Sequence, residues 1–355
     1  MIAAGGTAGH VVPALAVADA LRERGARVEF VGGERVEAEL VPAAGYPFYS
    51  LRVSGLDRDN PLRAARALGR ASGATLRAAA LLRRLRAGAV LGAGGYVSGP
   101  VGLAVATLRL PLFLTEADSH LGLANRALAP LARRVFLAFP LPGRTGSKWV
   151  LTGRPMPAGT GSVDRAAARV RLGIGPDESC VLVFGGSLGS RRLNDAAVEA
   201  FGAAAPGAVL HASGHRDHPH LRERLDALGA PAHYHLHPYI VPFADPLAAA
   251  DLAVARAGGS VMEVAAAGLP SILVPYPHAS ADHQTLNARH MESAGAAVVV
   301  PDAELDGPRL AREVAALLGA PQRLAAMARA ARAVARPDAA ARVADALIAA
   351  ARTAP

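Results

Sequence analysis

The chain has 355 residues, a length that suits two α/β domains better than one. Hydrophobic residues make up 52% and charged residues 19%, which excludes an intrinsically disordered chain. The formal net charge of +9 favours anionic partners, but no basic run is interleaved with aromatic residues. We therefore expect phosphorylated substrates or acidic lipids as partners, and no nucleic acid.

Short apolar runs alternate with longer stretches rich in Ala, Leu and Arg, a pattern typical of βαβ units and parallel sheets. In the first half we predict a helix over Val12–Arg24 that ends at Gly25. The strands predicted there are Met1–Ala4, Val28–Val31, Ala89–Leu91, Leu112–Leu114 and Val135–Ala138. The first half is thus predicted to be one α/β domain, residues 1–152.

A stretch rich in Gly, Pro, Ser and Thr, from 153 to 162, predicts a linker. The strand pattern then restarts. The strands predicted in the second half are Val181–Phe184, Ala208–His211, Leu252–Ala255, Ile272–Val274 and Ala297–Val300. Helices dominate from Pro308 onward, and the second domain is predicted to span residues 160–335.

The two halves repeat one pattern: a strand, two glycines, a hydroxyl residue, one more residue and a third glycine. It occurs at Gly5–Gly9 and at Gly185–Gly189, and a third glycine-rich turn at 92–100 follows the strand Ala89–Leu91. Such glycines let the backbone approach a phosphate, while the next helix offers free N–H groups. A plain tight turn would explain any one of them, but three together predict a phosphate- or sugar-binding cleft.

Other nucleotide-binding motifs fit the sequence poorly. A Walker-type loop needs a lysine, and Lys148 is the single lysine of the chain. A nicotinamide dehydrogenase needs G-x-G-x-x-G and an acidic residue at a strand end. This chain has G-G-x-x-G, and Glu29 lies in the middle of a predicted strand.

Two further patterns could suggest a metal. The D-x-D sequence at 57–59 has the spacing of a metal-binding motif but lies in a polar loop, so we interpret it as a solvated turn. His233, His235 and His237 alternate on one strand face, yet no carboxylate or cysteine accompanies them. We interpret them as surface or interface residues and expect no metal site.

Cys180, the single cysteine, lies in an apolar run that predicts a buried strand, which excludes a disulfide within the chain. The first residues lack the charged and apolar regions of a signal peptide. No window of about 18 apolar residues is free of charges and breaks. We therefore expect a cytoplasmic protein whose contact with a membrane is peripheral.

Five segments, spread over nearly the whole chain, carry a family resemblance. They are Gly5–Ala16, Gly94–Pro100, Gly185–Ser190, Glu263–Pro270 and Asp282–Ala288. In this order they resemble the MurG family of peptidoglycan N-acetylglucosaminyltransferases. Any one segment is a weak match, whereas five in register are specific.

The resemblance implies the GT-B fold, with two Rossmann-like domains facing a cleft and a C-terminal helix, residues 336–355, that packs on the N-terminal domain. It implies an inverting transfer of GlcNAc from UDP-GlcNAc to the C4 hydroxyl of undecaprenyl-pyrophosphoryl-MurNAc-pentapeptide. This step converts lipid I to lipid II in cell-wall synthesis, and so bears on cell shape and division. No cofactor is expected, and stimulation by a divalent ion stays open.

The resemblance also assigns residues to the two substrates. Ile240 would meet uracil, Glu263 the ribose hydroxyls, and the loop of Ser187 the pyrophosphate. The expected donor-binding residues are Thr7, Ala8, Gly9, Asp118, Arg154, Gly186, Ser187, Leu188, Gly189, Ile240, Gly259, Ser260, Val261, Met262, Glu263, Gln284 and Asn287. The expected acceptor-binding residues are Gly5, Gly6, His10, Gly94, Gly95, Tyr96, Ser98 and Asn125.

An inverting displacement needs a base beside the acceptor hydroxyl. His10 has an intrinsic pKa suited to that task, and we predict it as the base. A structural role for His10, bonding the neighbouring loop, is the alternative. Glu116 and Asp118 are the other catalytic candidates, because both follow the strand Leu112–Leu114.

Three features depart from the family pattern around the donor. Pro157 stands where a donor-contacting arginine is expected, with Arg154 as the neighbouring charge, and Asp118 stands where an asparagine is expected. The loop 256–263 is one residue short. A transferase with another glycolipid or aglycone acceptor, a UDP-GlcNAc 2-epimerase and a non-catalytic nucleotide-sugar-binding protein therefore stay open.

Residues 62–86 combine arginines with leucines, as suits an anionic bilayer surface. In the MurG family this region holds the membrane-docking patch, so we expect the protein at the cytoplasmic face of the plasma membrane. An ordinary helix with a solvated basic face is the alternative. The expected membrane residues are Leu62, Arg63, Arg66, Leu68, Arg70, Arg77, Leu81 and Leu82.

Overall fold

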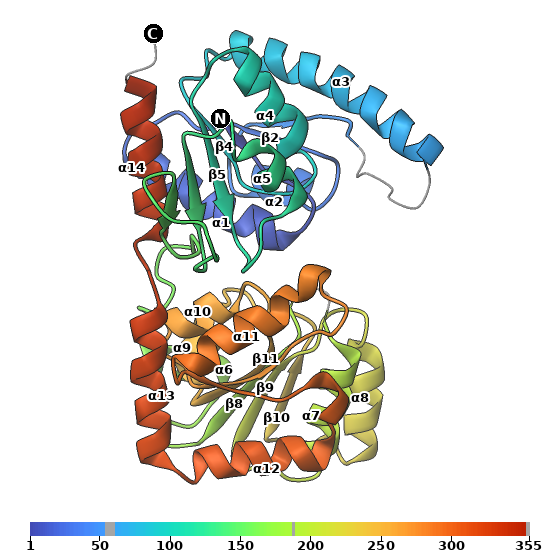
Figure 1. The fold of residues 1–355 in the computed structure, drawn as a ribbon. Coiled ribbons are helices and arrows are strands. Elements are labelled where there is room, and N and C mark those ends of the chain that lie inside the picture. The colour runs from blue at the N-terminus through green and yellow to red at the C-terminus, as the bar shows by residue number, and fades with distance from the viewer. Residues whose placement is uncertain (54–60, 187–188, 353–355) are drawn as a thin grey trace. The chain divides into compact units, whose positions relative to one another are not determined.

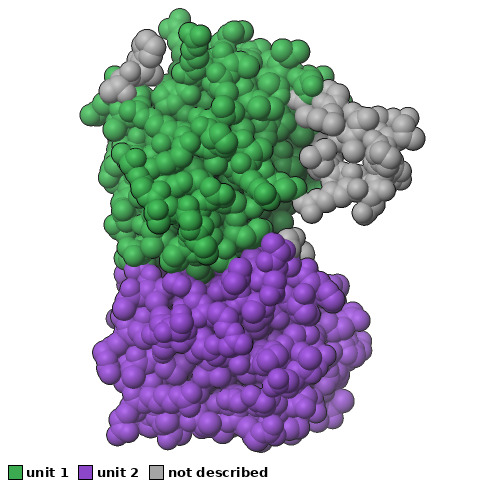
Figure 2. All heavy atoms as spheres, viewed as in Figure 1, with its two compact units in different colours: residues 1–158, 336–355 green, residues 159–335 purple. Residues whose placement is uncertain are grey.

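The computed structural model describes residues 1–53, 61–186 and 189–352, without the side chains of 61–71 and 280. The chain folds as two compact units (Figure 2). Unit 1 comprises residues 1–158 together with 336–355, and unit 2 comprises residues 159–335. The chain thus passes from one unit to the other twice. In the described part of the chain, no helix is both long and apolar enough to span a bilayer.

Unit 1 is built on a seven-stranded parallel sheet with the order β3-β2-β1-β4-β5-β6-β7. Its strands are β1 (Ile2–Ala3), β2 (Phe30–Gly32), β3 (Phe48–Ser50), β4 (Val90–Gly92), β5 (Leu112–Glu116), β6 (Arg134–Leu137) and β7 (Trp149–Leu151). Its helices are α1 (Ala8–Glu23), α2 (Glu37–Ala43), α3 (Pro61–Arg84), α4 (Ser98–Thr107), α5 (Leu123–Leu128) and α14 (Ala339–Arg352). The strand order reverses between β1 and β4, where parallel α/β sheets place their binding turns.

The last helix completes one face of the unit 1 sheet. α14 packs along α1, and the two helices lie side by side in Figure 1. Val343 and Leu347 of α14 are buried in the same apolar cluster as Val17 and Leu21 of α1. The predicted return of the C-terminal helix to the N-terminal domain is confirmed.

The other face of this sheet is covered by α3 and α4. Ala74, Ala78 and Leu82 of α3 are buried, which is the four-residue spacing of an inward helix face. Leu82, expected at a membrane, is 1% exposed and belongs to this core, and Leu81 is half-buried against it. Arg77 is exposed. The expected membrane residues between 62 and 70 lie outside the described side chains.

Unit 2 is built on a six-stranded parallel sheet with the order β10-β9-β8-β11-β12-β13. Its strands are β8 (Cys180–Phe184), β9 (Ala208–Ala212), β10 (Tyr234–His237), β11 (Leu252–Arg256), β12 (Ser271–Val274) and β13 (Ala297–Val299). Its helices are α6 (Arg165–Leu172), α7 (Arg191–Phe201), α8 (His218–Ala227), α9 (Ala244–Ala249), α10 (Val261–Ala266), η1 (Ser280–Asp282), α11 (His283–Ser293), η2 (Asp302–Glu304), α12 (Gly307–Leu318) and α13 (Pro321–Val334). Together the two sheets confirm the predicted α/β fold.

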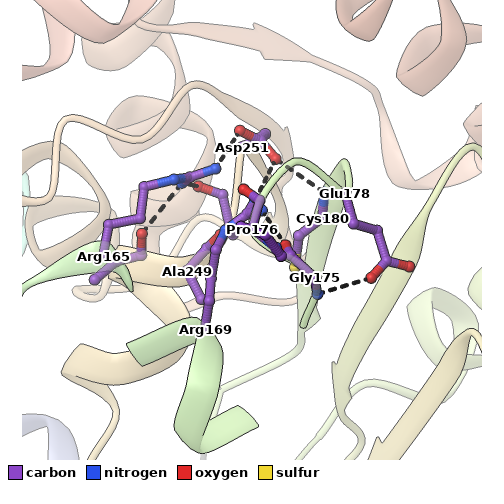
Figure 3. A network of polar contacts seen from close by, with 10 residues as sticks. Arg165, Arg169, Gly175, Pro176, Glu178, Cys180, Ala249 and Asp251 are labelled. Atoms are coloured by element: carbon purple, nitrogen blue, oxygen red, sulfur yellow. Dashed lines mark hydrogen bonds and ion pairs between the residues drawn. The ribbon is translucent and has the colours of Figure 1, made fainter. Parts of the chain in front are cut away.

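A charged cluster closes the amino end of the unit 2 sheet (Figure 3). Arg169 of α6 is 3% exposed, donates to three backbone carbonyls and pairs with Asp251 at 3.0 Å. The same carboxylate accepts the backbone N–H of Cys180 at 2.9 Å and pairs with Arg165 at 2.6 Å. Cys180 is buried in β8 as predicted, and burial raises the pKa of its thiol to about 12. These contacts fix α6 to the starts of β8 and β11.

Candidate functional site

The carboxyl edge of the unit 1 sheet is formed by turns that follow neighbouring strands. The turn after β1 leads into α1, and the turn after β4 leads into α4. Gly95 has a φ of +80°, and a methyl group added to it would lie 1.9 Å from the carbonyl oxygen of Gly5. The two turns therefore touch through their backbones, and only glycine fits at the contact.

His10 lies in the first turn of α1, against these turns. Its Nδ1 is 3.2 Å from the hydroxyl oxygen of Thr7. A methyl group added at Gly94 would lie 2.5 Å from Cδ2 of the imidazole, so the ring packs on that backbone. Arg154 donates to the carbonyl oxygen of Gly9 at 2.8 Å. Residues predicted from three separate stretches of sequence are thus brought together.

The surroundings of His10 favour its neutral form. Burial is the main influence and lowers the pKa of the imidazole, and the positive charge of Arg154 lowers it further. The carboxylates of Asp118 and Glu37 oppose this shift without overcoming it. The ring is therefore neutral at neutral pH, which is the form that accepts a proton.

Glu116, at the end of β5, is buried and shapes the turn that follows it. Its carboxylate accepts the backbone N–H groups of Asp118 at 3.3 Å and Gly122 at 2.8 Å, and the side-chain amide of Asn125 at 3.0 Å. Burial raises the pKa of Glu116, and these donors counteract the rise. Glu116 and Asn125 thus hold the turn that carries Asp118, the third catalytic candidate.

Two expected acceptor residues are engaged within unit 1. The hydroxyl of Ser98 is buried and donates to the carbonyl oxygen of Gly94 at 2.8 Å. The hydroxyl of Tyr96 donates to Glu37 at 3.2 Å. Glu37, which is fully buried at the start of α2, was not predicted from the sequence. The available signal was the glycine pair 32–33 at the end of β2, a further glycine turn at the same edge.

The carboxyl edge of the unit 2 sheet repeats the glycine-turn design. After β8, a methyl group at Gly185 would lie 2.5 Å from the backbone nitrogen of Ser190. Gly189 has a φ of +72°, and its added methyl would lie 2.2 Å from the carbonyl oxygen of Ser213. Ser187 and Leu188 lie outside the described residues. The turn leads directly into α7, whose N-terminus is the kind of position that binds anions.

Arg256, at the end of β11, ties the turns of this edge together. It is 6% exposed and donates through Nε to the hydroxyl of Ser190 at 2.8 Å. Its Nη1 donates to the carbonyl oxygens of Val274 and Pro275, both at 3.2 Å, and pairs with Asp302 at 2.6 Å. Arg256 was not among the predicted site residues, although a charged residue at the end of an apolar strand was a signal that it faces a site.

Glu263 lies in the first turn of α10 and is half-buried. Burial raises the pKa of Tyr239, and the negative charge of Glu263 adds to that rise. The charge of Glu263 thus acts on Tyr239, which precedes Ile240 in the chain. The resemblance assigns Glu263 to the ribose and Ile240 to the base.

Three other expected donor residues turn their side chains inward. Val261 and Met262 are buried in the core, so they can offer a ligand only their backbone at the start of α10. Asn287 is fully buried, and its Nδ2 donates to the carbonyl oxygen of Ala257 at 3.0 Å. Its side chain supports the turn at Gly259 and Ser260, which precedes α10.

Gln284, at the start of α11, reaches the same turns. Its Oε1 accepts the backbone N–H of Tyr276 at 3.0 Å. Its Nε2 faces Gly258, where an added methyl would lie 3.9 Å away. The side chain thus bridges the turns after β11 and β12.

Within the described residues, no group of three or more His, Cys, Asp or Glu side chains could hold a metal ion. His233 precedes the edge strand β10 and makes a 2.8 Å hydrogen bond with the carbonyl oxygen of Phe201. His235 and His237 lie on that strand. The D-x-D sequence at 57–59 lies outside the described residues.

Two parallel α/β units, each with glycine turns at the carboxyl edge of its sheet, define a glycosyltransferase of the GT-B class. The family description "Glycosyltransferase family 28 N-terminal domain" matches residues 1–137, and "Glycosyltransferase family 28 C-terminal domain" matches residues 180–343. The chain belongs to glycosyltransferase family 28.

The predicted resemblance to MurG is also confirmed. Relatives from Acidithiobacillus ferrooxidans and Alkalilimnicola ehrlichii are both named UDP-N-acetylglucosamine–N-acetylmuramyl-(pentapeptide) pyrophosphoryl-undecaprenol N-acetylglucosamine transferase. The first is 43% identical over 98% of this chain and 96% of its own length, the second 44% over 97% and 96%. The crystal structure of Acinetobacter baumannii MurG superposes with a TM-score of 0.78 at 31% identity, covering 98% of each chain.

Proposed function

We propose that this protein transfers GlcNAc from UDP-GlcNAc to the C4 hydroxyl of MurNAc in undecaprenyl-pyrophosphoryl-MurNAc-pentapeptide, converting lipid I to lipid II. The observation that carries the proposal is the identity above 40%, over nearly the full chain, to relatives named for this transfer. Glycine turns at the edge of each sheet, in the family's order, support it.

Unit 2 is the proposed donor domain. The turn after β8 and the N-terminus of α7 would hold the diphosphate of UDP. The buried guanidinium of Arg256 would fix this turn through its hydrogen bond to Ser190. Such a site stabilises the negative charge that develops on the leaving diphosphate without a metal ion. Glu263 would accept hydrogen bonds from the two ribose hydroxyls, since an ionised carboxylate offers acceptors only.

Unit 1 is the proposed acceptor domain, and His10 is its proposed base. The neutral imidazole would take the proton of the acceptor hydroxyl as that oxygen attacks the anomeric carbon of GlcNAc and the bond to UDP breaks. Arg154 donates a hydrogen bond to the carbonyl oxygen of Gly9, so its positive charge lies at the turn that carries His10. Asp118 would orient the hydroxyl or the transferred sugar from the turn after β5.

We further propose that unit 1 docks on the cytoplasmic face of the plasma membrane through the C-terminal half of α3. In that half Leu76 is 73% exposed, and Arg77 beside it is exposed too. An open hollow of about 570 Å³ at the end of the helix is lined by Arg83, Arg86 and Arg109 among leucines. Cations beside apolar side chains suit anionic headgroups at a bilayer surface.

Radiolabel transfer tests the reaction itself. We expect the full-length protein to move labelled GlcNAc from UDP-GlcNAc to a lipid I analogue, and to release UDP in equal amount. Without acceptor, the donor should stay intact and keep its C2 configuration. Turnover of the donor without acceptor would instead support the epimerase, and binding without turnover the non-catalytic protein.

Replacing Glu263 with Ala tests the donor site. Loss of a charged acceptor should weaken UDP binding by roughly 10- to 100-fold, since hydrogen bonds to charged groups are worth about 1.5–3 kcal/mol. Titration calorimetry with UDP measures it. Glu223→Ala, which removes an exposed carboxylate from α8 of the same unit, is the matched control and should leave the affinity unchanged. Equal affinities for both variants would remove Glu263 from the site.

Replacing His10 tests the base. His10→Ala should lower kcat by about 10²- to 10⁴-fold while UDP affinity is kept, because UDP belongs to unit 2. His10→Asn can keep a hydrogen bond to Thr7 but cannot take the proton, so it should be equally slow. Because the pKa of His10 is lowered, the acid limb of the wild-type kcat/KM profile should lie below about 6.5. An Asn variant that keeps more than about a tenth of kcat would make the histidine structural.

Charge reversal tests the membrane surface. Arg77, Arg83 and Arg86 changed together to Glu should reduce binding to vesicles containing phosphatidylglycerol by roughly 100-fold or more, at about 1 kcal/mol per charge. Binding of the wild type should weaken with added salt. The control reverses three exposed arginines of unit 2, Arg312, Arg323 and Arg329, and changes the net charge equally. If both triple variants lose binding alike, the attraction is a property of net charge and not of this surface.

A further inference from the structure

Glu37 is a fully buried carboxylate beneath the glycine turns of unit 1. Its Oε2 accepts the backbone N–H of Gly6 at 2.9 Å. Its Oε1 accepts the backbone N–H of Gly33 at 3.0 Å and the hydroxyl of Tyr96 at 3.2 Å. The three donors follow three neighbouring strands, β1, β2 and β4, so one side chain joins all three turns.

The surrounding backbone leaves room for this carboxylate and for little else. A methyl group added at Gly5 or Gly33 would lie 2.8 Å from Oε1, and one at Gly32 would lie 2.9 Å from Cγ. The backbone N–H groups of Gly6 and Gly33 can only donate, one to each oxygen, so the buried group must be an acceptor at both oxygens. An ionised carboxylate meets that requirement, whereas an amide would present an NH₂ group to one of the donors.

Two of the three turns also hold His10. Gly6 immediately precedes Thr7, whose hydroxyl lies 3.2 Å from the imidazole Nδ1. Tyr96 lies two residues after Gly94, on whose backbone the ring packs. Glu37 therefore fixes both segments that contact the imidazole, although it does not touch the ring itself.

We propose that Glu37 is the positioning residue for His10: by anchoring the turns at Gly6 and Tyr96, it sets the place and the charge environment of the imidazole. This inference rests on the proposed role of His10 as the base. The charged groups that act on His10 are Asp118 after β5, Arg154 after β7 and Glu37 on α2. Loss of the Glu37 charge removes one of the two anions that oppose the lowering of the pKa.

The test compares Glu37→Gln with the wild-type protein. The amide turns a donor toward the N–H of Gly6 or toward the N–H of Gly33, so one of the turns joined by Glu37 loses its anchor. We expect kcat for GlcNAc transfer to fall about 10- to 100-fold, while KM for UDP-GlcNAc changes less than about twofold. The pKa of His10 should fall, because an anion has been removed, so the acid limb of kcat/KM should move to lower pH. NMR titration of the His10 ring, assigned with His10→Asn, reads the same shift without turnover.

Glu29→Gln is the matched control. Glu29 is 9% exposed and immediately precedes β2, whereas Glu37 binds the turn that follows β2. The control therefore removes the same charge at the opposite end of the same strand. We expect wild-type kcat and an unchanged His10 titration. If Glu37→Gln matches this control in kcat and in the titration, Glu37 does not position His10. The same follows if its lost activity equals the fraction of unfolded protein seen by circular dichroism.

A second variant, Gly33→Ala, keeps the negative charge of Glu37 but displaces its carboxylate. In Gly33→Ala the new methyl would lie 1.9 Å from the Tyr96 hydroxyl and 2.8 Å from the Glu37 carboxylate, so both must shift. We expect kcat to fall about tenfold with UDP-GlcNAc KM unchanged, and this variant decides the question if Glu37→Gln does not fold. Full activity in Gly33→Ala would overturn the inference. A wild-type protein without transfer activity would overturn the proposed function. The His10 titrations would still decide whether Glu37 positions the His10 ring.

Discussion

Direct backbone contact between glycine turns is the constraint on which both units depend. In unit 1 the turn at Gly95 touches the carbonyl of Gly5, and in unit 2 the turn at Gly189 touches the carbonyl of Ser213. Any side chain at these glycines would separate the turns. Because the turns follow strands of one parallel sheet, the same contacts determine where the helices after them begin and which residues face a substrate.

Each set of turns is held together by one buried charged side chain, and the two side chains carry opposite charges. In unit 1 the anion Glu37 takes up an N–H of the first glycine turn, which removes a donor that a phosphate could use. In unit 2 the cation Arg256 binds carbonyl oxygens and adds its charge to the positive end of α7. This difference agrees with the proposed division of labour. A diphosphate suits unit 2, and a hydroxyl that must lose a proton suits the turns around His10.

The strands of both sheet centres could be predicted from the sequence because they are short, fully apolar runs. β3 and β7 were missed, since each has only three residues and none of those residues is buried. Leu82 was misassigned because arginines and leucines on one helix look alike whether the leucines face a core or a bilayer, and only the packing of α3 separates them.

The glycine turns were also accessible from the sequence, because a turn after a strand carries its signal locally, and the resemblance supplied the other candidate residues. The residues that hold the turns together were not. Glu37 acts on Gly6 and Tyr96, and Arg256 acts on Ser190 and Asp302, all at distances along the chain that no local pattern spans.

The return of α14 to unit 1 has a consequence for synthesis of the chain. Unit 2 is one continuous segment, so all of its residues are synthesised before the last helix is made. The face of α1 that includes Val17 and Leu21 stays uncovered until Val343 and Leu347 arrive. The domain begun first is therefore finished last, and its apolar helix face is the part of the nascent protein that a chaperone would have to shield.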